Sequence, residues 1–185
     1  NKIAFTGSTQ VGKLIQKSLA GRDVGLTLEL GGKAANIVYD DAAIDQAVEG
    51  VVNGIFFNQG HVCCAGSRLL LQESIHDQFV KKLEKRMQSL RVGNPLDKNT
   101  DIGAINSKEQ LDKITSLVNE GVEDGGELFQ TQCDLPGNGF WFRPSLFTNV
   151  QPSYSIAREE IFGPVLTTLT FRTPEEAVEI ANNTE

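Results

Sequence analysis

The chain has 185 residues, of which 39% are hydrophobic and 22% charged, and this length suits one ordinary domain or one domain with part of another. A net charge of −7 with no basic tail argues against a nucleic-acid or anionic-membrane partner. Three cysteines, two of them adjacent, form a poor disulfide framework and indicate a reducing compartment, the cytoplasm or alternatively the mitochondrial matrix.

The first residues predict half of a βαβ unit. Ile3–Phe5 predicts a short buried strand, Gly7 and Ser8 a tight turn, and the apolar residues that follow recur at helical spacing. The N-terminus of such a helix can hold an anion through its free amides and its dipole. Residues 7–13 nearly match the P-loop pattern, but Leu14 stands where a Ser or Thr would bind magnesium, which argues against a nucleotide triphosphatase.

A second strand pattern, Gly25–Leu30, alternates apolar and polar residues and ends before two glycines. Glu29 lies at this end, where a carboxylate can project into a cleft. The alternative is a surface Glu on a half-exposed strand. Ala35–Tyr39 predicts a further strand, and Asp40 or Asp41 can cap the helix that follows it.

That helix ends near a turn that is bracketed by glycines, Phe57–Ser67, and contains Cys63 and Cys64. The two thiols interrupt the helical periodicity, and the small residues around them leave room for another molecule to approach. A structural cysteine usually lies within a periodic element, so this position favours a catalytic Cys63, with a buried inert thiol as the alternative. A zinc site is not predicted, because His61, Cys63 and Cys64 are too close together for tetrahedral ligation and no second ligand pair follows.

The rest of the chain continues to alternate strands and helices. Ser67–Gln72 predicts a strand, and Ser74 with Asp77 predicts a capping box. The next helix carries an apolar stripe made of Ile75, Phe79, Leu83, Met87 and Leu90, and a solvated basic face made of Lys81, Lys82, Lys85 and Arg86. The later predicted elements are a helix capped by Ser107, a strand at 127–129, a strand ending at Val150, a turn at 159–164, a strand at 165–171 and a helix opened by Thr173 and Pro174. This alternation predicts an α/β protein with a mainly parallel sheet flanked by helices.

Four segments together resemble the aldehyde dehydrogenase superfamily. They are Phe-Thr-Gly-Ser at 5–8, Glu-Leu-Gly-Gly-Lys at 29–33, the turn that contains Cys63, and Glu-Glu-Ile-Phe-Gly-Pro at 159–164. They follow one another in the family's order along the whole chain. The family's proteins are much longer, so the resemblance implies an internal segment. Residues 1–31 would be the C-terminal part of the NAD(P)-binding domain, and 32–185 the catalytic domain without its C-terminal end.

The resemblance also implies roles for the matching residues. Cys63 would be the nucleophile, and Glu29 the general base, in the oxidation of an aldehyde to a carboxylic acid by NAD or NADP, without a metal. Cys64 would be a bystander. The residues implied in coenzyme binding are Gly7, Ser8, Leu30, Gln110, Lys113, Glu160 and Phe162. These residue types suit the chemistry, because sulfur is both a strong nucleophile and a fair leaving group, and a Glu in a partly dehydrated cleft can act as a base near neutral pH.

The chain departs from the family pattern at His61, where most members have Gln, and at Ala104, where members often have Pro. The family's oxyanion-stabilising Asn would precede residue 1, so we expect the 185 residues alone to be inactive. Two alternatives stay open: an acylating relative that passes the thioester to coenzyme A, against which Glu29 argues, and a catalytically silent module with a binding or assembly role. The family commonly forms dimers or tetramers, which the resemblance implies for the full-length protein.

Overall fold

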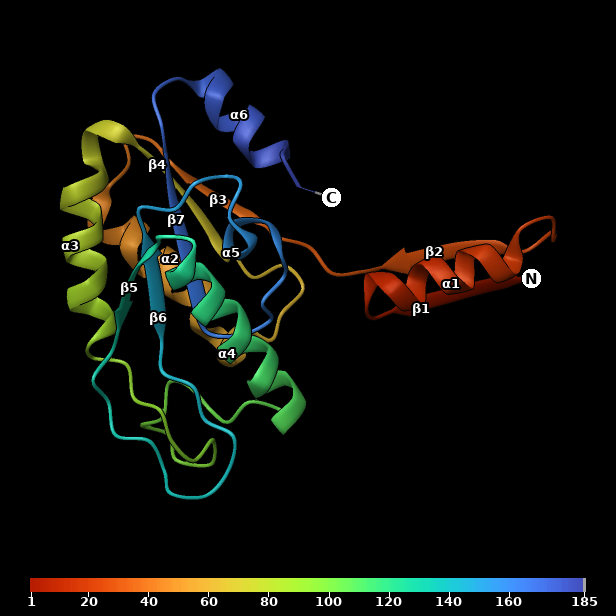
Figure 1. Cartoon of the computed structure of the whole chain (residues 1–185), viewed down its shortest axis with the longest axis horizontal. Coiled ribbons are helices and arrows are strands. Elements are labelled where there is room, and N and C mark those ends of the chain that lie inside the picture. The colour runs from red at the N-terminus through yellow and green to blue at the C-terminus, as the bar shows by residue number, and fades with distance from the viewer. Residues whose placement is uncertain (185) are drawn as a thin grey trace. The chain divides into compact units, whose positions relative to one another are not determined.

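The computed structural model describes residues 1–184. The chain divides into two compact units, Asn1–Gly32 and Lys33–Glu185 (Figure 1). Within residues 1–184, no helix combines the length and the apolar character that crossing a membrane requires. In the same range, no three His, Cys, Asp or Glu side chains gather as the ligands of a metal ion would.

The first unit is a βαβ motif made of β1 (Lys2–Thr6), α1 (Thr9–Leu19) and β2 (Gly25–Glu29). β1 and β2 pair in parallel, as the sequence predicted. Ser8 caps α1, and its side-chain oxygen accepts a hydrogen bond from the Val11 amide at 3.4 Å. The predicted burial of Ile3–Phe5 is wrong, because Ile3 and Ala4 are exposed. β1 is one of only two strands in this sheet, so few side chains of its own unit are available to cover it.

The second unit is built on a five-stranded sheet with the strand order β3-β4-β7-β6-β5. The strands are β3 (Ala35–Val38), β4 (Arg68–Gln72), β5 (Glu127–Gln130), β6 (Ser145–Thr148) and β7 (Val165–Phe171). Neighbouring strands are parallel except at one edge, where β5 pairs antiparallel with β6. The predicted α/β class with a mainly parallel sheet is therefore confirmed.

Helices lie between most of these strands along the chain, and the last helix follows β7. They are α2 (Ile44–Phe56), α3 (His76–Met87), α4 (Lys108–Glu123), α5 (Ser155–Arg158) and α6 (Pro174–Asn182), with short 3-10 turns η1 (Phe57–Gly60) and η2 (Glu73–Ile75). Two helix starts follow the prediction. Ser107 Oγ accepts a hydrogen bond from the Gln110 amide at 3.1 Å, and Thr173 caps α6 with Pro174 as its first residue.

Two predicted caps are wrong. α2 begins after Ala43, and α3 begins after η2, and no side chain caps either helix. The polar groups concerned bond to one another instead: Gln72 Nε2 and Ser74 Oγ donate to the Asp40 carboxylate at 2.9 and 3.4 Å. These bonds join the end of β3 to the end of β4, and this tertiary contact replaces both caps.

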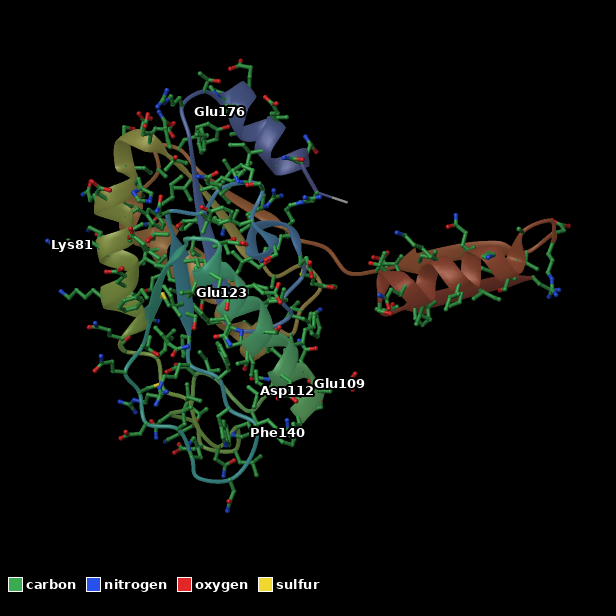
Figure 2. The ribbon with its side chains drawn as sticks, in the orientation of Figure 1. Lys81, Glu109, Asp112, Glu123, Phe140 and Glu176 are labelled. Atoms are coloured by element: carbon green, nitrogen blue, oxygen red, sulfur yellow. The ribbon has the colours of Figure 1, made fainter. Side chains whose placement is uncertain are left out.

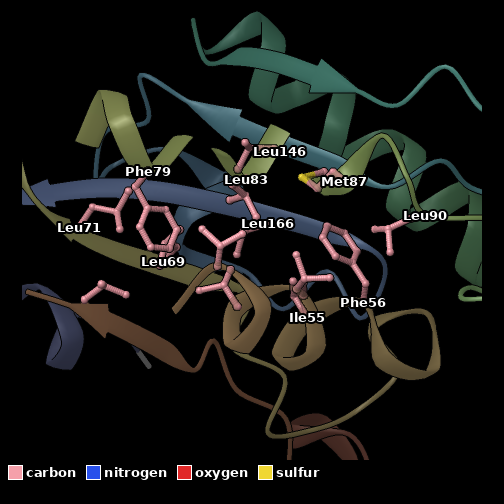
Figure 3. Packing of buried hydrophobic residues seen from close by; sticks show 14 of the residues in the cluster. Ile55, Phe56, Leu69, Leu71, Phe79, Leu83, Met87, Leu90, Leu146 and Leu166 are labelled. Atoms are coloured by element: carbon pink, nitrogen blue, oxygen red, sulfur yellow. The ribbon is translucent and has the colours of Figure 1, made fainter. Parts of the chain in front are cut away.

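The core is organised around β4, which is buried on both faces. Leu69 and Leu71 pack in one cluster with residues of α2 and α3, whereas Leu70 packs on the opposite face with Phe171 of β7 and Ala177 of α6. This alternation explains the uninterrupted leucine run, because side chains of a strand covered on both faces point alternately into two apolar layers. Figure 3 shows the residues of the first cluster that come from α2, α3, β4, β6 and β7.

The two faces of α3 confirm the predicted stripe and the predicted basic surface. All five residues of the apolar stripe are buried. Lys81, which extends away from the helix in Figure 2, and Lys85 are exposed. Lys82 and Arg86 form ion pairs with Asp45 and Glu49 of α2, respectively. Such solvent-exposed pairs each stabilise a fold by only about 0–1 kcal/mol.

Candidate functional site

Three adjacent parallel strands bring the segments that precede them to one edge of the sheet. β3, β4 and β7 are neighbours, with Ala35 opposite Arg68 and Arg68 opposite Thr167. The Thr167 amide also donates to the Ser67 carbonyl at 3.0 Å. Because these strands run in the same direction, the segments before them lie together at the N-terminal ends of the strands, which form one edge of the sheet. These segments are Lys33–Ala34, the cysteine turn and Glu160–Pro164.

The cysteine turn, residues 57–67, contains a β-turn in which Cys63 and Cys64 are the two central residues. Its hydrogen bond runs from the Ala65 amide to the Val62 carbonyl at 3.0 Å. Both side chains are exposed, and neither cysteine is in a disulfide. Cys63 is therefore not buried, as the alternative interpretation would require.

The chain reaches this turn from α2 through a sharp reversal. Asn58, Gln59 and Gly60 have φ values of 50°, 56° and 72°, all in the left-handed region. Side chains stabilise the reversal: Asn58 Nδ2 donates to the His61 carbonyl at 3.1 Å, and Gln59 Oε1 accepts from the Gly103 amide at 3.0 Å. Several hydrogen bonds thus hold the backbone just before Cys63 in a conformation that residues other than Gly rarely adopt.

The segment that precedes β7 is held by the first turns of α4. Gln110 Nε2 donates to the carbonyls of Ile161 and Phe162 at 2.8 and 3.1 Å, and Lys113 Nζ donates to the Glu160 carbonyl at 2.8 Å. Four of the residues implied in coenzyme binding therefore lie together. Gln110 and Lys113 donate these hydrogen bonds to backbone carbonyls of the segment. The half-buried side chains of Glu160 and Phe162 complete the group.

Two contacts join this segment to the cysteine turn. The rings of His61 and Phe162 are stacked, with centroids 5.1 Å apart and planes inclined by 5°. A Cβ atom at Gly60 would lie 2.2 Å from the Gly163 carbonyl oxygen, so the two backbones meet without a side chain between them. The sequence did not reveal either contact, since the partners are about a hundred residues apart and share no local pattern.

Lys33 adds a buried amino group to the same edge. Its side chain is 5% exposed, and Nζ has no hydrogen-bond partner among the described residues. Burial, with smaller contributions from the positive charges of Arg68 and Lys113, lowers the pKa of Lys33 to about 7, although the nearby Glu160 carboxylate acts in the opposite direction. Nothing in the sequence indicates this state, because lysine is ordinarily exposed and Lys33 is marked only as the last residue of the Glu-Leu-Gly-Gly-Lys segment.

Arg68 lies next to Lys33 and is anchored at the end of α6. Its Nη1 donates to the Ile180 carbonyl at 2.7 Å, and its Nη2 donates to the Ala181 carbonyl at 2.8 Å and to the Lys33 carbonyl at 3.2 Å. A guanidinium group here binds two carbonyls of the last helical turn, and its positive charge complements the helix dipole. Arg68 therefore links the backbone at Lys33 to the end of α6.

The remaining residues implied by the resemblance lie in the first unit. The Gly7 amide donates to the Glu29 carbonyl at 3.0 Å, which ties the turn before α1 to the end of β2. Ser8 is the N-cap of α1, and the Glu29 side chain is exposed. Leu30 packs against α1 at Gly12, where a Cβ atom would lie 2.5 Å from Leu30 Cδ2. Gly7, Ser8, Glu29 and Leu30 thus form one group, whereas Cys63 and the residues held by α4 belong to the second unit.

Comparisons with known proteins agree on one family. The sequence model described as "Aldehyde dehydrogenase family" matches residues 1–185. Retinal dehydrogenase 2 of Taeniopygia guttata and that of Rattus norvegicus are each 48% identical to this chain over 187 residues. Both alignments cover all of this chain and 36% of the relative, so the chain spans about a third of the length of these curated relatives.

Solved structures give the same result. An NAD-dependent aldehyde dehydrogenase from Sinorhizobium meliloti superimposes with a TM-score of 0.92 at 43% identity, over 100% of this chain and 37% of that chain. Betaine aldehyde dehydrogenase from Staphylococcus aureus, crystallised in complex with NAD+, superimposes with a TM-score of 0.92 at 38% identity, over 99% of this chain and 37% of that chain. These matches confirm the resemblance that the four segments indicated.

Proposed function

This chain belongs to the aldehyde dehydrogenase family, and from that premise we propose that the full-length protein oxidises an aldehyde to a carboxylic acid with NAD or NADP. The observation that carries the proposal is the exposed Cys63 thiol, in a turn whose preceding residues contact the Glu160–Phe162 segment. A reactive cysteine requires an accessible sulfur, and this turn supplies it.

We assign Cys63 the role of nucleophile. Its thiolate forms a bond to the carbonyl carbon of the aldehyde, and the carbonyl π electrons move to the oxygen to give a tetrahedral oxyanion. The oxyanion then re-forms the carbonyl while the C–H bond of the adduct breaks, which leaves a thioester on Cys63. NAD or NADP, when bound, would accept the hydride that leaves. Cys64, the other central residue of the turn, takes no part in these steps.

We assign Glu29 the role of general base in the second half of the reaction. The Glu29 carboxylate takes a proton from a water molecule, whose oxygen attacks the thioester carbon. The carbon–sulfur bond then breaks, the carboxylic acid leaves, and the Cys63 thiolate is restored. An enzyme that passed its acyl group to coenzyme A would have less need of such a base.

The residues present suit a dinucleotide. The first turn of α1 leaves backbone amides without intrahelical acceptors, and with Gly7 and Ser8 it suits the pyrophosphate. The Glu160 carboxylate can accept hydrogen bonds from sugar hydroxyls, and the Phe162 ring offers an aromatic face. Leu30 contributes its backbone carbonyl, while Gln110 and Lys113 support the segment that carries Glu160 and Phe162.

The domain assignment is also part of the proposal. Residues 1–31 would complete a coenzyme domain, and residues 32–185 would form most of a catalytic domain. The division of the chain into Asn1–Gly32 and Lys33–Glu185 supports this assignment. We further propose that the full-length protein is a homodimer or homotetramer that lies in the cytoplasm, which size-exclusion chromatography with light scattering and cell fractionation would test.

The test is to compare Cys63→Ser with Cys64→Ser in the full-length protein. NADH and NADPH formation would be followed with short, long and aromatic aldehydes. Cys63→Ser should lower kcat by about 10³-fold or more, because it removes the nucleophile, whereas Cys64→Ser should keep nearly full activity. Mass spectrometry of a rapidly quenched reaction should find the acyl group on Cys63.

Two results would contradict the proposal. Full activity of the Cys63→Ser variant would exclude Cys63 as the nucleophile. If the unaltered protein binds NAD but turns over none of the aldehydes, the catalytically silent module becomes the better description.

A further inference from the structure

His61 lies two residues before Cys63 and is the only residue of the cysteine turn whose ring stacks on another aromatic side chain. The centroid distance of 5.1 Å and the inclination of 5° describe an offset, parallel pair with Phe162. The Gln side chain that the resemblance leads us to expect at this position has no ring and could not form this stack.

The environment of His61 favours an uncharged ring. Nε2 is buried and has no hydrogen-bond partner among the described residues. Burial lowers the pKa of His61 below its usual value of 6.5, so the imidazole is neutral at pH 7. The ring therefore contributes a flat surface to the contact with Phe162 and makes no hydrogen bond through Nε2.

The backbone of Phe162 is already fixed by other groups. Its φ of 54° lies in the left-handed region, and its carbonyl accepts a hydrogen bond from Gln110 Nε2 at 3.1 Å. The next residue, Gly163, touches Gly60. These contacts act on the backbone and leave the plane of the Phe162 ring open. Among the described residues, the aromatic partner of this ring is His61.

We propose that His61 is a positioning residue, which sets the plane of the Phe162 ring and through it the affinity for the coenzyme. The inference rests on the proposed function, because it takes Phe162 to be one of the residues that contact NAD or NADP. It goes beyond that function by giving a role to a residue that the proposed reaction does not use.

The test measures NAD+ binding to the full-length protein by isothermal titration calorimetry, so that it does not depend on turnover. His61→Leu keeps an apolar side chain and removes the ring, and should raise Kd by about 2- to 12-fold, the range that the loss of one aromatic pair gives. His61→Phe keeps a flat ring without Nε2, and its Kd should stay near that of the unaltered protein. His76→Leu, which alters the other histidine of the chain at the start of α3, is the matched control and should leave Kd unchanged.

The outcomes separate this inference from the proposed function. Equal Kd values for His61→Leu and His61→Phe, whether both normal or both raised, would overturn the role of the stacked ring while the proposed function stands. A double-mutant cycle with Phe162→Leu should show that His61→Leu has no further effect once the Phe162 ring is absent, and full additivity would likewise overturn the inference. If the unaltered protein binds neither NAD+ nor NADP+, the proposed function fails, and the inference fails with it.

Discussion

Because Lys33 is buried, we expect its deprotonation to stabilise the folded state. The free energy of unfolding should therefore rise with pH, whereas a lysine that forms an ion pair makes it fall. The folded-state pKa is about 7, whereas an unfolded chain has the ordinary value of 10.5. Below pH 7 both states carry the proton, and the folded state bears the full cost of a buried charge. Between pH 7 and 10.5 the unfolded state binds more protons than the folded state, so stability rises with pH in this window.

Lys33→Met should remove this dependence. We expect the free energy of unfolding of the full-length protein to rise from pH 7 to pH 9 relative to that of the variant, by at most about 1.4 kcal/mol per pH unit for one proton. Urea unfolding at several pH values measures the difference. Lys81→Met, at an exposed position on α3, is the control and should follow the unaltered protein at every pH. Parallel profiles for Lys33→Met and the unaltered protein would show that Lys33 keeps its ordinary pKa.

At the scale of elements, the link between the cysteine turn and the start of β7 depends on Gly60. This residue has φ 72°, and a Cβ atom there would lie 2.2 Å from the Gly163 carbonyl oxygen. An alanine would suffer both the left-handed backbone and a contact with another backbone atom, which cannot turn aside as a flexible side chain can. The close approach of two backbones is therefore what permits His61 to reach Phe162.

Gly60→Ala should lower the free energy of unfolding by more than about 2 kcal/mol, from the left-handed conformation and the clash together. Gly50→Ala is the matched control. Gly50 lies within α2, where an added Cβ meets no atom within 4 Å, so this change should stabilise the helix by about 0.5–1 kcal/mol. Urea unfolding of both variants in the full-length protein measures these changes. An unchanged free energy of unfolding for Gly60→Ala would mean that the cysteine turn and the segment before β7 do not touch.

Local patterns predicted the elements well and their mutual contacts poorly. The five-residue stripe of α3 and the cap at Ser107 follow from periodicity and from spacing within one turn, which a sequence displays directly. The predicted caps at Asp40 and Ser74 failed because a partner from another strand, Gln72, binds the Asp40 carboxylate instead. Local spacing does not reveal such competition.

In the candidate site, too, the sequence predicted the segments but not the contacts between them. The cysteine turn and the Glu160–Phe162 segment could be located from their motifs, yet nothing in the sequence indicated that His61 stacks on Phe162 or that Lys33 is buried. Both features depend on the adjacency of β3, β4 and β7. Strand order is a property of the whole sheet, and it decides which distant segments share an edge.

At the scale of the whole molecule, the two units differ greatly in their apolar cores. All three buried clusters belong to the second unit. In the first unit Ile3, Val11 and Leu14 are exposed, and its sheet has two strands. Units of fewer than about 40 residues rarely bury enough surface to fold alone, and an isolated two-stranded sheet is at best marginally stable.

We therefore expect the 185 residues, produced alone, to be protected unevenly against hydrogen exchange. Amides of β1 and β2 should exchange at least about 100-fold faster than those of β4 and β7, since local opening needs far less free energy than global unfolding. In the full-length protein the first unit should be protected. Because Gly7, Ser8 and Glu29 lie in that unit, the isolated chain should also form no NADH from aldehydes. Equal protection of both units would show that the first unit is stable without further chain, and aldehyde-dependent NADH formation would show that these 185 residues contain a complete active site.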